Sequence, residues 1–190
     1  MQPINLTSAL AAGKDLVAKV QTASGVDVKA CYQCGKCSAG CPVAFAMDYT
    51  PRQVMRMLQL GLAEETIKSR AIWLCAQCET CSARCPRSLE PAKVMEALRI
   101  EAKRAGFEAD DEIATFNEKF LRSVASNGRV FEAGLIVGYN MATVQPLKDA
   151  GVAPSMLAKG KLKLFPSKIR GRDVINRMFT KAEKMEADNK

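Results

Sequence analysis

Residues 31–42 read CYQCGKCSAGCP, and residues 75–86 read CAQCETCSARCP. Both stretches follow the pattern C-x2-C-x2-C-x3-C-P, and together they contain all eight cysteines of the 190-residue chain. One tight loop can present three cysteines at this spacing, because each step of three residues turns the chain through about one helical turn. The pattern is typical of loops that hold iron–sulfur clusters.

The fourth cysteine of each stretch is expected to serve the cluster of the other stretch. In two-cluster ferredoxins with this spacing, the cysteine before the proline ligates the second cluster rather than the first. The sequence therefore predicts two [4Fe–4S] clusters with crossed ligands. Cluster A is expected to be held by Cys31, Cys34, Cys37 and Cys85, and cluster B by Cys75, Cys78, Cys81 and Cys41.

Zinc is the alternative metal for a cysteine-rich sequence. Zinc sites built from four cysteines usually combine two C-x2-C pairs across a longer spacer, whereas this chain repeats a complete four-cysteine set with a terminal proline. The chain also contains no histidine. This excludes His-ligated haem, His-containing zinc or copper sites, Rieske centres, and Ser/His or Cys/His catalytic pairs. The pattern therefore favours iron–sulfur clusters and one-electron chemistry.

The duplication continues into a helix that follows each cysteine set. Thr50 is a good N-cap, Gln53 completes a capping box, and Gly61 and Gly106 are expected to end the two helices. The same apolar positions recur forty residues later in the second helix. The recurring residues are Val54, Met55 and Leu58, and Val94, Met95 and Leu98. The apolar faces are expected to consist of Val54, Met57 and Leu58 in the first helix, and of Val94, Met95, Leu98 and Ala102 in the second. We expect them to form a core rather than to contact a cofactor.

The remaining sequence also favours helices. Ala, Leu, Met, Lys and Glu outnumber aromatic and β-branched residues, and no segment alternates as a strand does. Further helices are expected over 6–23, 62–70, 113–127, 129–140 and 172–184. The predicted fold is all-α, with a helical ferredoxin-like domain followed by extra helices and an extended basic C-terminal arm. The βαββαβ ferredoxin fold fits less well, because it normally holds its two motifs closer together.

Four parts are expected along the chain: an N-terminal helix over 1–26, the duplicated cluster domain over 27–107, a helical extension over 108–143 and the arm over 144–190. The arm contains eleven Lys and Arg against five Asp and Glu, which is six of the eight net positive charges. Its most basic stretch has one aromatic residue, Phe165, and no nucleic-acid-binding motif. We therefore expect a solvated face or a docking strip for an acidic protein, and no nucleic acid.

Membrane insertion and secretion are not expected. The longest stretch without a charged residue covers 133–147, which is shorter than the roughly 20 residues of a membrane span. The first 20 residues lack the pattern of a secretory signal. A cytoplasmic location is therefore expected, and in that reducing compartment the cysteines indicate metal rather than disulfides.

Beyond the cysteines, the sequence resembles a known family, the C subunit of soluble heterodisulfide reductase, which is a helical ferredoxin with two [4Fe–4S] clusters. The resemblance is carried by the paired cysteine sets, by 47–61 (MDYTPRQVMRMLQLG), by 127–132 (NGRVFE) and by 156–162 in the arm. It implies an electron-relay subunit of an oxidoreductase complex, with no catalytic site of its own. It also implies that electrons come from a flavin-containing A subunit and pass to a B subunit. The non-cubane clusters of that B subunit reduce the coenzyme M–coenzyme B heterodisulfide.

The resemblance further implies a larger complex, linked to a hydrogenase or a formate dehydrogenase, that bifurcates electrons between the heterodisulfide and ferredoxin. The chain lacks an adjacent Cys-Cys pair and any G-x-G-x-x-G loop, so we expect neither a disulfide-reducing site nor a flavin or NAD site. The iron–sulfur subunit of succinate dehydrogenase fits less well, because no cysteines remain for its [2Fe–2S] domain. Two alternatives stay open: the same relay in a related complex with another acceptor, and a non-catalytic iron–sulfur sensor or scaffold.

Overall fold

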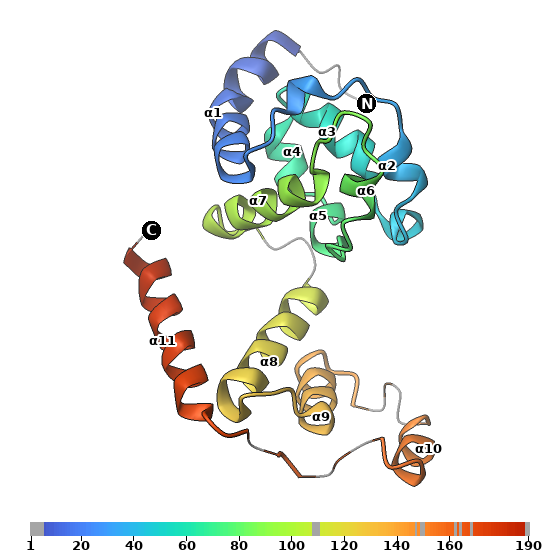
Figure 1. Ribbon diagram of the computed structural model, residues 1–190, viewed down its shortest axis with the longest axis vertical. Coiled ribbons are helices and arrows are strands. Elements are labelled where there is room, and N and C mark those ends of the chain that lie inside the picture. The colour runs from blue at the N-terminus through green and yellow to red at the C-terminus, as the bar shows by residue number, and fades with distance from the viewer. Residues whose placement is uncertain are drawn as a thin grey trace. The chain divides into compact units, whose positions relative to one another are not determined.

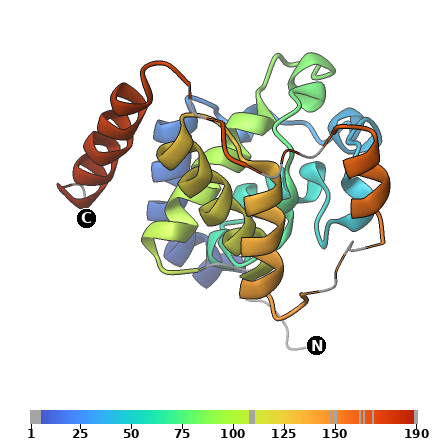
Figure 2. The same ribbon diagram turned by 90° about the horizontal axis from the view of Figure 1, so that it is seen from below.

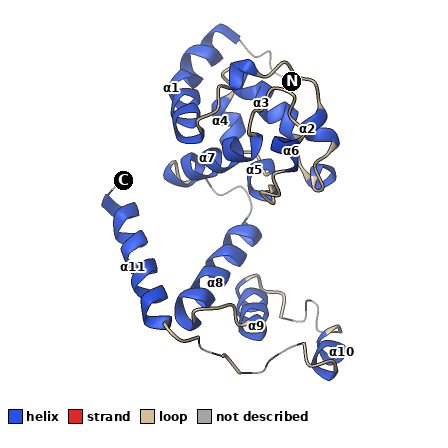
Figure 3. Ribbon diagram, viewed as in Figure 1, coloured by secondary structure: helices blue, strands red, loops and turns tan. Residues whose placement is uncertain are grey.

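A computed structural model of the chain shows the all-α fold that the sequence predicts. The structure describes residues 6–107, 111–146, 148, 151–161, 163, 165–167 and 169–188. These residues form helices and loops and include no strand (Figure 3). Contacts divide the chain into two compact units, residues 1–110 and 111–190. The finer division at residues 26, 107 and 143 stays a prediction.

The first unit contains both cysteine motifs (Figure 1). Its elements are α1 (Leu6–Ser24), the 3-10 turn η1 (Val28–Ala30), α2 (Lys36–Ala39), the 3-10 turn η2 (Ala44–Ala46), α3 (Pro51–Gln59), α4 (Ala63–Ile67), α5 (Ala71–Leu74), α6 (Thr80–Ala83) and α7 (Pro91–Arg104). The helices expected over 6–23, after Pro51 and after Pro91 are confirmed. The single helix expected over 62–70 is instead the shorter α4, which a turn separates from α5.

The duplicated helices α3 and α7 supply most of the core of the first unit. Helix α7 packs against α1, α4 and α5, and α3 packs against α4. The side chains predicted as core are buried: Val54, Met57, Leu58, Val94, Met95, Leu98 and Ala102. The capping box of α3 is also confirmed, since Gln53 Oε1 accepts hydrogen bonds from Thr50 N and Thr50 Oγ1, both at 2.8 Å.

Helix α1 approaches the end of α3 very closely. Gly13 of α1 is buried, and a Cβ added there would overlap the carbonyl group of Gly61. Gly61 has a φ of 72°, the left-handed conformation that allows the chain to leave α3 and turn into α4. The packing of α1 on this turn therefore requires glycine at position 13.

The second unit contains α8 (Asp111–Asn127), α9 (Glu132–Ala142), α10 (Ala153–Ala158) and α11 (Arg172–Asp188). Helix α8 packs against α9 and α11. Its contact with α9 includes the rings of Phe116 and Tyr139, which meet edge to face at 5.7 Å. Among the described residues of this unit only Leu135 and Asn140 are buried. The second unit therefore has a much smaller core than the first.

The helices of the second unit differ in detail from the expected ranges. Helix α9 begins at Glu132 rather than at 129, because Phe131 is extended and its N–H donates to Ser123 Oγ at 2.9 Å. In the arm, α10 was not expected, and α11 runs beyond the predicted end at 184 as one unbroken helix (Figure 2). No helix in the described parts of the chain has both the length and the apolar character needed to cross a membrane.

Candidate functional site

Two open hollows in the first unit are each lined by four cysteines. Hollow A, of about 330 Å³, contains Cys31, Cys34, Cys37 and Cys85. Hollow B, of about 380 Å³, contains Cys41, Cys75, Cys78 and Cys81. Each hollow thus combines three cysteines of one motif with the fourth of the other, which is the grouping that the spacing predicts. That these cysteines bind iron stays a prediction.

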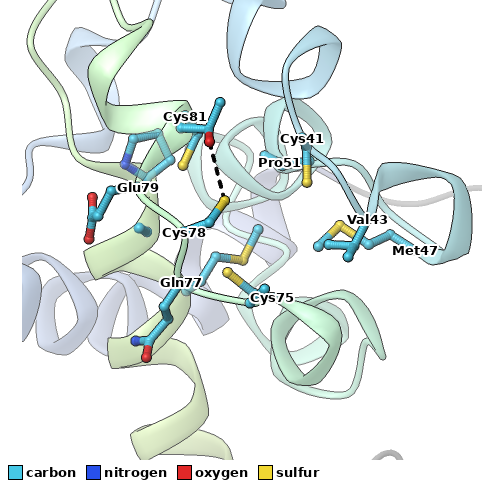
Figure 4. A pocket seen from close by; sticks show the side chains of 14 residues that line it. Cys41, Val43, Met47, Pro51, Cys75, Gln77, Cys78, Glu79 and Cys81 are labelled. Atoms are coloured by element: carbon cyan, nitrogen blue, oxygen red, sulfur yellow. Dashed lines mark hydrogen bonds between the residues drawn. The ribbon is translucent and has the colours of Figure 1, made fainter.

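The crossing is visible in hollow B (Figure 4), where Cys41 faces the other three cysteines across the hollow. Cys41 follows α2, whereas Cys75, Cys78 and Cys81 lie between the end of α5 and the middle of α6. Helices α2 and α6 pack against each other, so the ends of the two motifs are held side by side. None of the eight cysteines forms a disulfide.

The two cysteine loops repeat the same backbone conformation. Gln33 and Gly35 have φ angles of 66° and 82°, and the equivalent Gln77 and Glu79 have φ angles of 49° and 59°. Each loop therefore has two residues in the left-handed backbone conformation before its short helix, α2 or α6, begins. The second of these residues is glycine in the first motif but glutamate in the second. The Cβ of the glutamate raises the free energy of the left-handed conformation.

One side chain from each long helix fixes the start of the corresponding cysteine loop. Gln59 Nε2 donates hydrogen bonds to the carbonyl oxygens of Val28 at 2.8 Å and Cys31 at 2.7 Å. Arg99 Nη1 donates to the carbonyl oxygen of Cys75 at 3.2 Å. Gln59 and Arg99 are equivalent in the duplication. Sequence reasoning missed both, although the forty-residue offset that aligns Leu58 with Leu98 also aligns these two residues.

Hollow A has two nitrogen donors directed at its cysteine sulfurs. Gln33 Nε2 donates to Cys31 Sγ at 3.5 Å, and the N–H of Leu89 donates to Cys85 Sγ at 3.4 Å. The hollow is also lined by Arg52, a residue of α3 that sequence reasoning did not single out. The Arg52 N–H donates to Ser38 Oγ at 2.9 Å, which ties the start of α3 to α2.

Hollow B has a different set of polar neighbours. The Cys78 thiol and the Thr80 hydroxyl lie within hydrogen-bonding distance, with Sγ and Oγ1 3.4 Å apart. Glu79 lines the hollow, and apolar walls are provided by Val43, Met47, Pro51, Pro91, Ala92 and Met95. The two hollows therefore share their cysteine arrangement but differ in the charges and donors around them.

The thiols differ in acidity with their surroundings. Burial raises the pKa of the Cys37, Cys75 and Cys81 thiols, whereas hydrogen bonding with Thr80 lowers the pKa of Cys78. A metal binds the thiolate, so its binding releases the thiol proton and becomes more favourable as the pH rises. The raised pKa values mean that protons compete with metal up to a higher pH at Cys37, Cys75 and Cys81, which are partly buried.

The donor set fits an iron–sulfur cluster. Four sulfur donors in an apolar surrounding suit iron–sulfur chemistry. Within the described residues, no three or more His, Cys, Asp or Glu are placed to hold one metal ion. A cubane cluster does not require that arrangement, because each thiolate binds a different iron.

Comparison with known proteins points to the same cofactor. The family described as 4Fe-4S dicluster domain matches residues 27–89, which supports [4Fe–4S] clusters in this part of the chain. The chain is 38% identical over 115 residues to the iron–sulfur C subunit of the CoB–CoM heterodisulfide reductase of Methanopyrus kandleri, and the match covers 60% of each chain.

A second relative is the C subunit of the H(2):CoB-CoM heterodisulfide,ferredoxin reductase of Methanothermobacter thermautotrophicus. It is 34% identical over 127 residues, which cover 66% of this chain and 69% of the relative. The chain therefore spans between 60% and 69% of the length of these two curated relatives. On this similarity, the chain belongs to the family of heterodisulfide reductase iron–sulfur C subunits.

Proposed function

We propose that the chain is the electron-relay subunit of a cytoplasmic heterodisulfide reductase complex. In this proposal the cysteines of hollow A hold one [4Fe–4S] cluster, A, and those of hollow B hold a second, B. The observation that supports it most strongly is the gathering of three cysteines from one motif and one from the other in each hollow. Each bound cluster supplies one-electron transfer.

The arrangement of the cysteines supports a relay rather than a catalyst. Each of the eight cysteines lines one of the two hollows, four in each. In this proposal all eight thiols bind clusters, so no thiol is left to attack a disulfide. The relatives are named as C subunits of an oxidoreductase complex. We therefore assign the chemical step to other subunits, and only electron transfer to this chain.

The partners in this proposal are those that the family resemblance implies. A flavin-containing A subunit supplies the electrons, and a B subunit with non-cubane clusters receives them and reduces the coenzyme M–coenzyme B heterodisulfide. The complex is linked to a hydrogenase or a formate dehydrogenase and bifurcates electrons to ferredoxin. The name of the Methanothermobacter thermautotrophicus relative mentions hydrogen and ferredoxin, which supports the hydrogen- and ferredoxin-linked part of this assignment.

The chain's own residues have three tasks in this relay. Gln59 and Arg99 hold the first cysteine of each loop through its carbonyl oxygen. Met55 and Met95, both almost fully buried, form part of the hollow walls and exclude water. The N–H groups directed at sulfur in hollow A stabilise added negative charge there.

Anaerobic purification of the native complex tests the proposal. We expect flavin in a co-purifying subunit. In the separated, cluster-loaded chain we expect about eight irons and eight sulfides per copy, and two interacting EPR signals after reduction. The partners should remain bound in both the oxidised and the reduced state. A partner that is bound in one cluster state only would identify a sensor instead. Recovery of four irons, or of zinc, would overturn the two-cluster assignment.

A further inference from the structure

The two halves of the duplication hold their first cysteine with side chains of different charge. Gln59 in α3 and Arg99 in α7 occupy equivalent positions, and each donates to the carbonyl oxygen of the first cysteine of its own loop. The structural task is therefore the same in both halves. A neutral amide performs it at hollow A, whereas a guanidinium group, which is always protonated in proteins, performs it at hollow B.

The charge of Arg99 is placed to act on hollow B. The side chain is only partly exposed, so water screens it less than a fully exposed cation. No ion pair with a carboxylate is found for Arg99 among the described residues. Gln59, in contrast, carries no charge and donates only to main-chain carbonyls. Its Oε1 accepts from Gln33 Nε2 at 3.4 Å and from Arg56 Nη1 at 3.2 Å. Arg56 is exposed, so water screens its charge more strongly than that of Arg99.

We infer that Arg99 is a positioning residue that also raises the reduction potential of cluster B, and that Gln59 provides the same positioning at cluster A without this electrostatic contribution. The inference rests on the proposed function, since it requires both clusters. A reduced cluster carries one more negative charge than an oxidised one, and a nearby cation stabilises that form.

Two exposed charged residues line the hollows, one in each, in addition to this pair. Arg52 lines hollow A, and Glu79 lines hollow B; both are exposed and so more strongly screened than Arg99. They influence which cluster has the higher potential overall. They are unchanged when Arg99 or Gln59 is substituted, so the effect of each substitution can be measured against the same background.

The duplication supplies matched variants for the test. Arg99→Gln replaces the cation by the residue that the first half uses, which retains a donor for the Cys75 carbonyl. Arg99→Lys retains the charge, and Gln59→Arg introduces it at cluster A. Each variant of the full chain is loaded with clusters and titrated with a reductant, and the potentials of the two clusters are read from their EPR signals.

We expect Arg99→Gln to lower the ratio of reduced to oxidised cluster B about threefold at a fixed potential near its midpoint, which is a shift of about 28 mV for a one-electron couple. Cluster A should not move, Arg99→Lys should behave as the wild type, and Gln59→Arg should raise the potential of A. An unchanged potential of B in Arg99→Gln overturns the inference, as does an equal shift of both clusters.

The failure of this inference is distinguishable from the failure of the proposed function. Iron and sulfide contents establish whether both clusters are present before any potential is compared. One outcome is that wild type and Arg99→Gln both contain two clusters. If the potential of each cluster is then the same in the two proteins, the relay assignment stands and the role of the Arg99 charge is rejected. If the wild type itself holds fewer than two clusters, the proposed function fails, and the inference fails with it.

Discussion

Arg84 lies directly against Gly40, and the two residues occupy the same position in the two cysteine motifs. A Cβ added to Gly40 would come within 2.7 Å of Arg84 Cδ and 2.8 Å of its Nη1. The contact forms where α2 packs against α6. Gly40 directly precedes Cys41 of hollow B in the sequence, and Arg84 directly precedes Cys85 of hollow A. Two equivalent residues therefore contact each other, and the Arg84 side chain has space only because the residue opposite it, Gly40, has no side chain.

This contact predicts that the two positions can exchange residues but cannot both be arginine. Gly40→Arg should lower the free energy of unfolding by about 2 kcal/mol, because two guanidinium groups and their stems compete for one space. Adding Arg84→Gly should recover most of this loss. Urea unfolding of the cluster-loaded protein, followed by cluster absorbance, measures both. A double variant as unstable as Gly40→Arg alone would contradict the exchange.

Crossed ligation predicts which cysteine variants resemble one another. Cys85→Ser and Cys37→Ser should perturb the same EPR signal although they lie in different motifs, and Cys41→Ser should pair with Cys81→Ser, because the hollows combine them in this way. Spectra of the four reduced variants decide the matter. If Cys85→Ser and Cys81→Ser alter one shared signal, each motif instead serves its own cluster.

The close approach of α1 to the end of α3 predicts a severe effect of a single methyl group. Gly13→Ala should lower the free energy of unfolding by about 2 kcal/mol or more, because its Cβ would overlap the Gly61 carbonyl, and backbone cannot move aside as a side chain can. Gly138→Ala in α9 is the control, since no atom lies within 4 Å of its added Cβ. Far-UV circular dichroism during unfolding should show the control unchanged or more stable by up to about 1 kcal/mol. Equal losses in both variants would mean that crowding at Gly13 is not the cause.

Glu79 predicts a stabilising substitution inside a cysteine motif. Its φ of 59° is left-handed, which costs roughly 1–2 kcal/mol for a residue with a Cβ. Glu79→Gly should therefore raise the free energy of unfolding by about 1 kcal/mol after the greater entropy of glycine is counted. Glu79→Gln removes the charge but retains the strain, and it should leave the stability nearly unchanged. Equal stabilisation by both variants would assign the effect to charge.

The basic arm is predicted to serve assembly rather than cluster binding. Deletion of residues 144–190 should leave both cluster signals intact, because every cysteine lies in the first unit. It should weaken binding to the proposed partner subunits about tenfold or more, a loss of about 1.4 kcal/mol per factor of ten. Replacement of Lys159, Lys161 and Lys163 by Gln is the milder companion variant, and its defect should shrink at high salt. A truncated chain that cannot load clusters would place the arm in the folded core.

Much of the first unit could be predicted from the sequence because its signals are local. The cysteine spacing indicated the crossed grouping, and the capping box and apolar periodicity indicated α3 and α7. Arg52 and Leu89 were not predicted as part of hollow A, because they reach it from outside the cysteine loop, and only the packed structure shows such contacts. The limits of α9 were missed for a similar reason, since the Ser123 hydroxyl of the preceding helix holds Phe131 in an extended conformation.

The gathering of Cys31 with Cys85, and of Cys41 with Cys75, also has a consequence for biosynthesis. A ribosome releases the chain from its N-terminus, so the first motif emerges well before the second. At that stage hollow A lacks Cys85 and hollow B has only Cys41. If the cysteines bind as proposed, neither cluster can be fully ligated until the second motif has been translated. Cofactor insertion is then a late event that depends on a nearly complete first unit, and a nascent chain arrested between the two motifs cannot retain a fully ligated cluster.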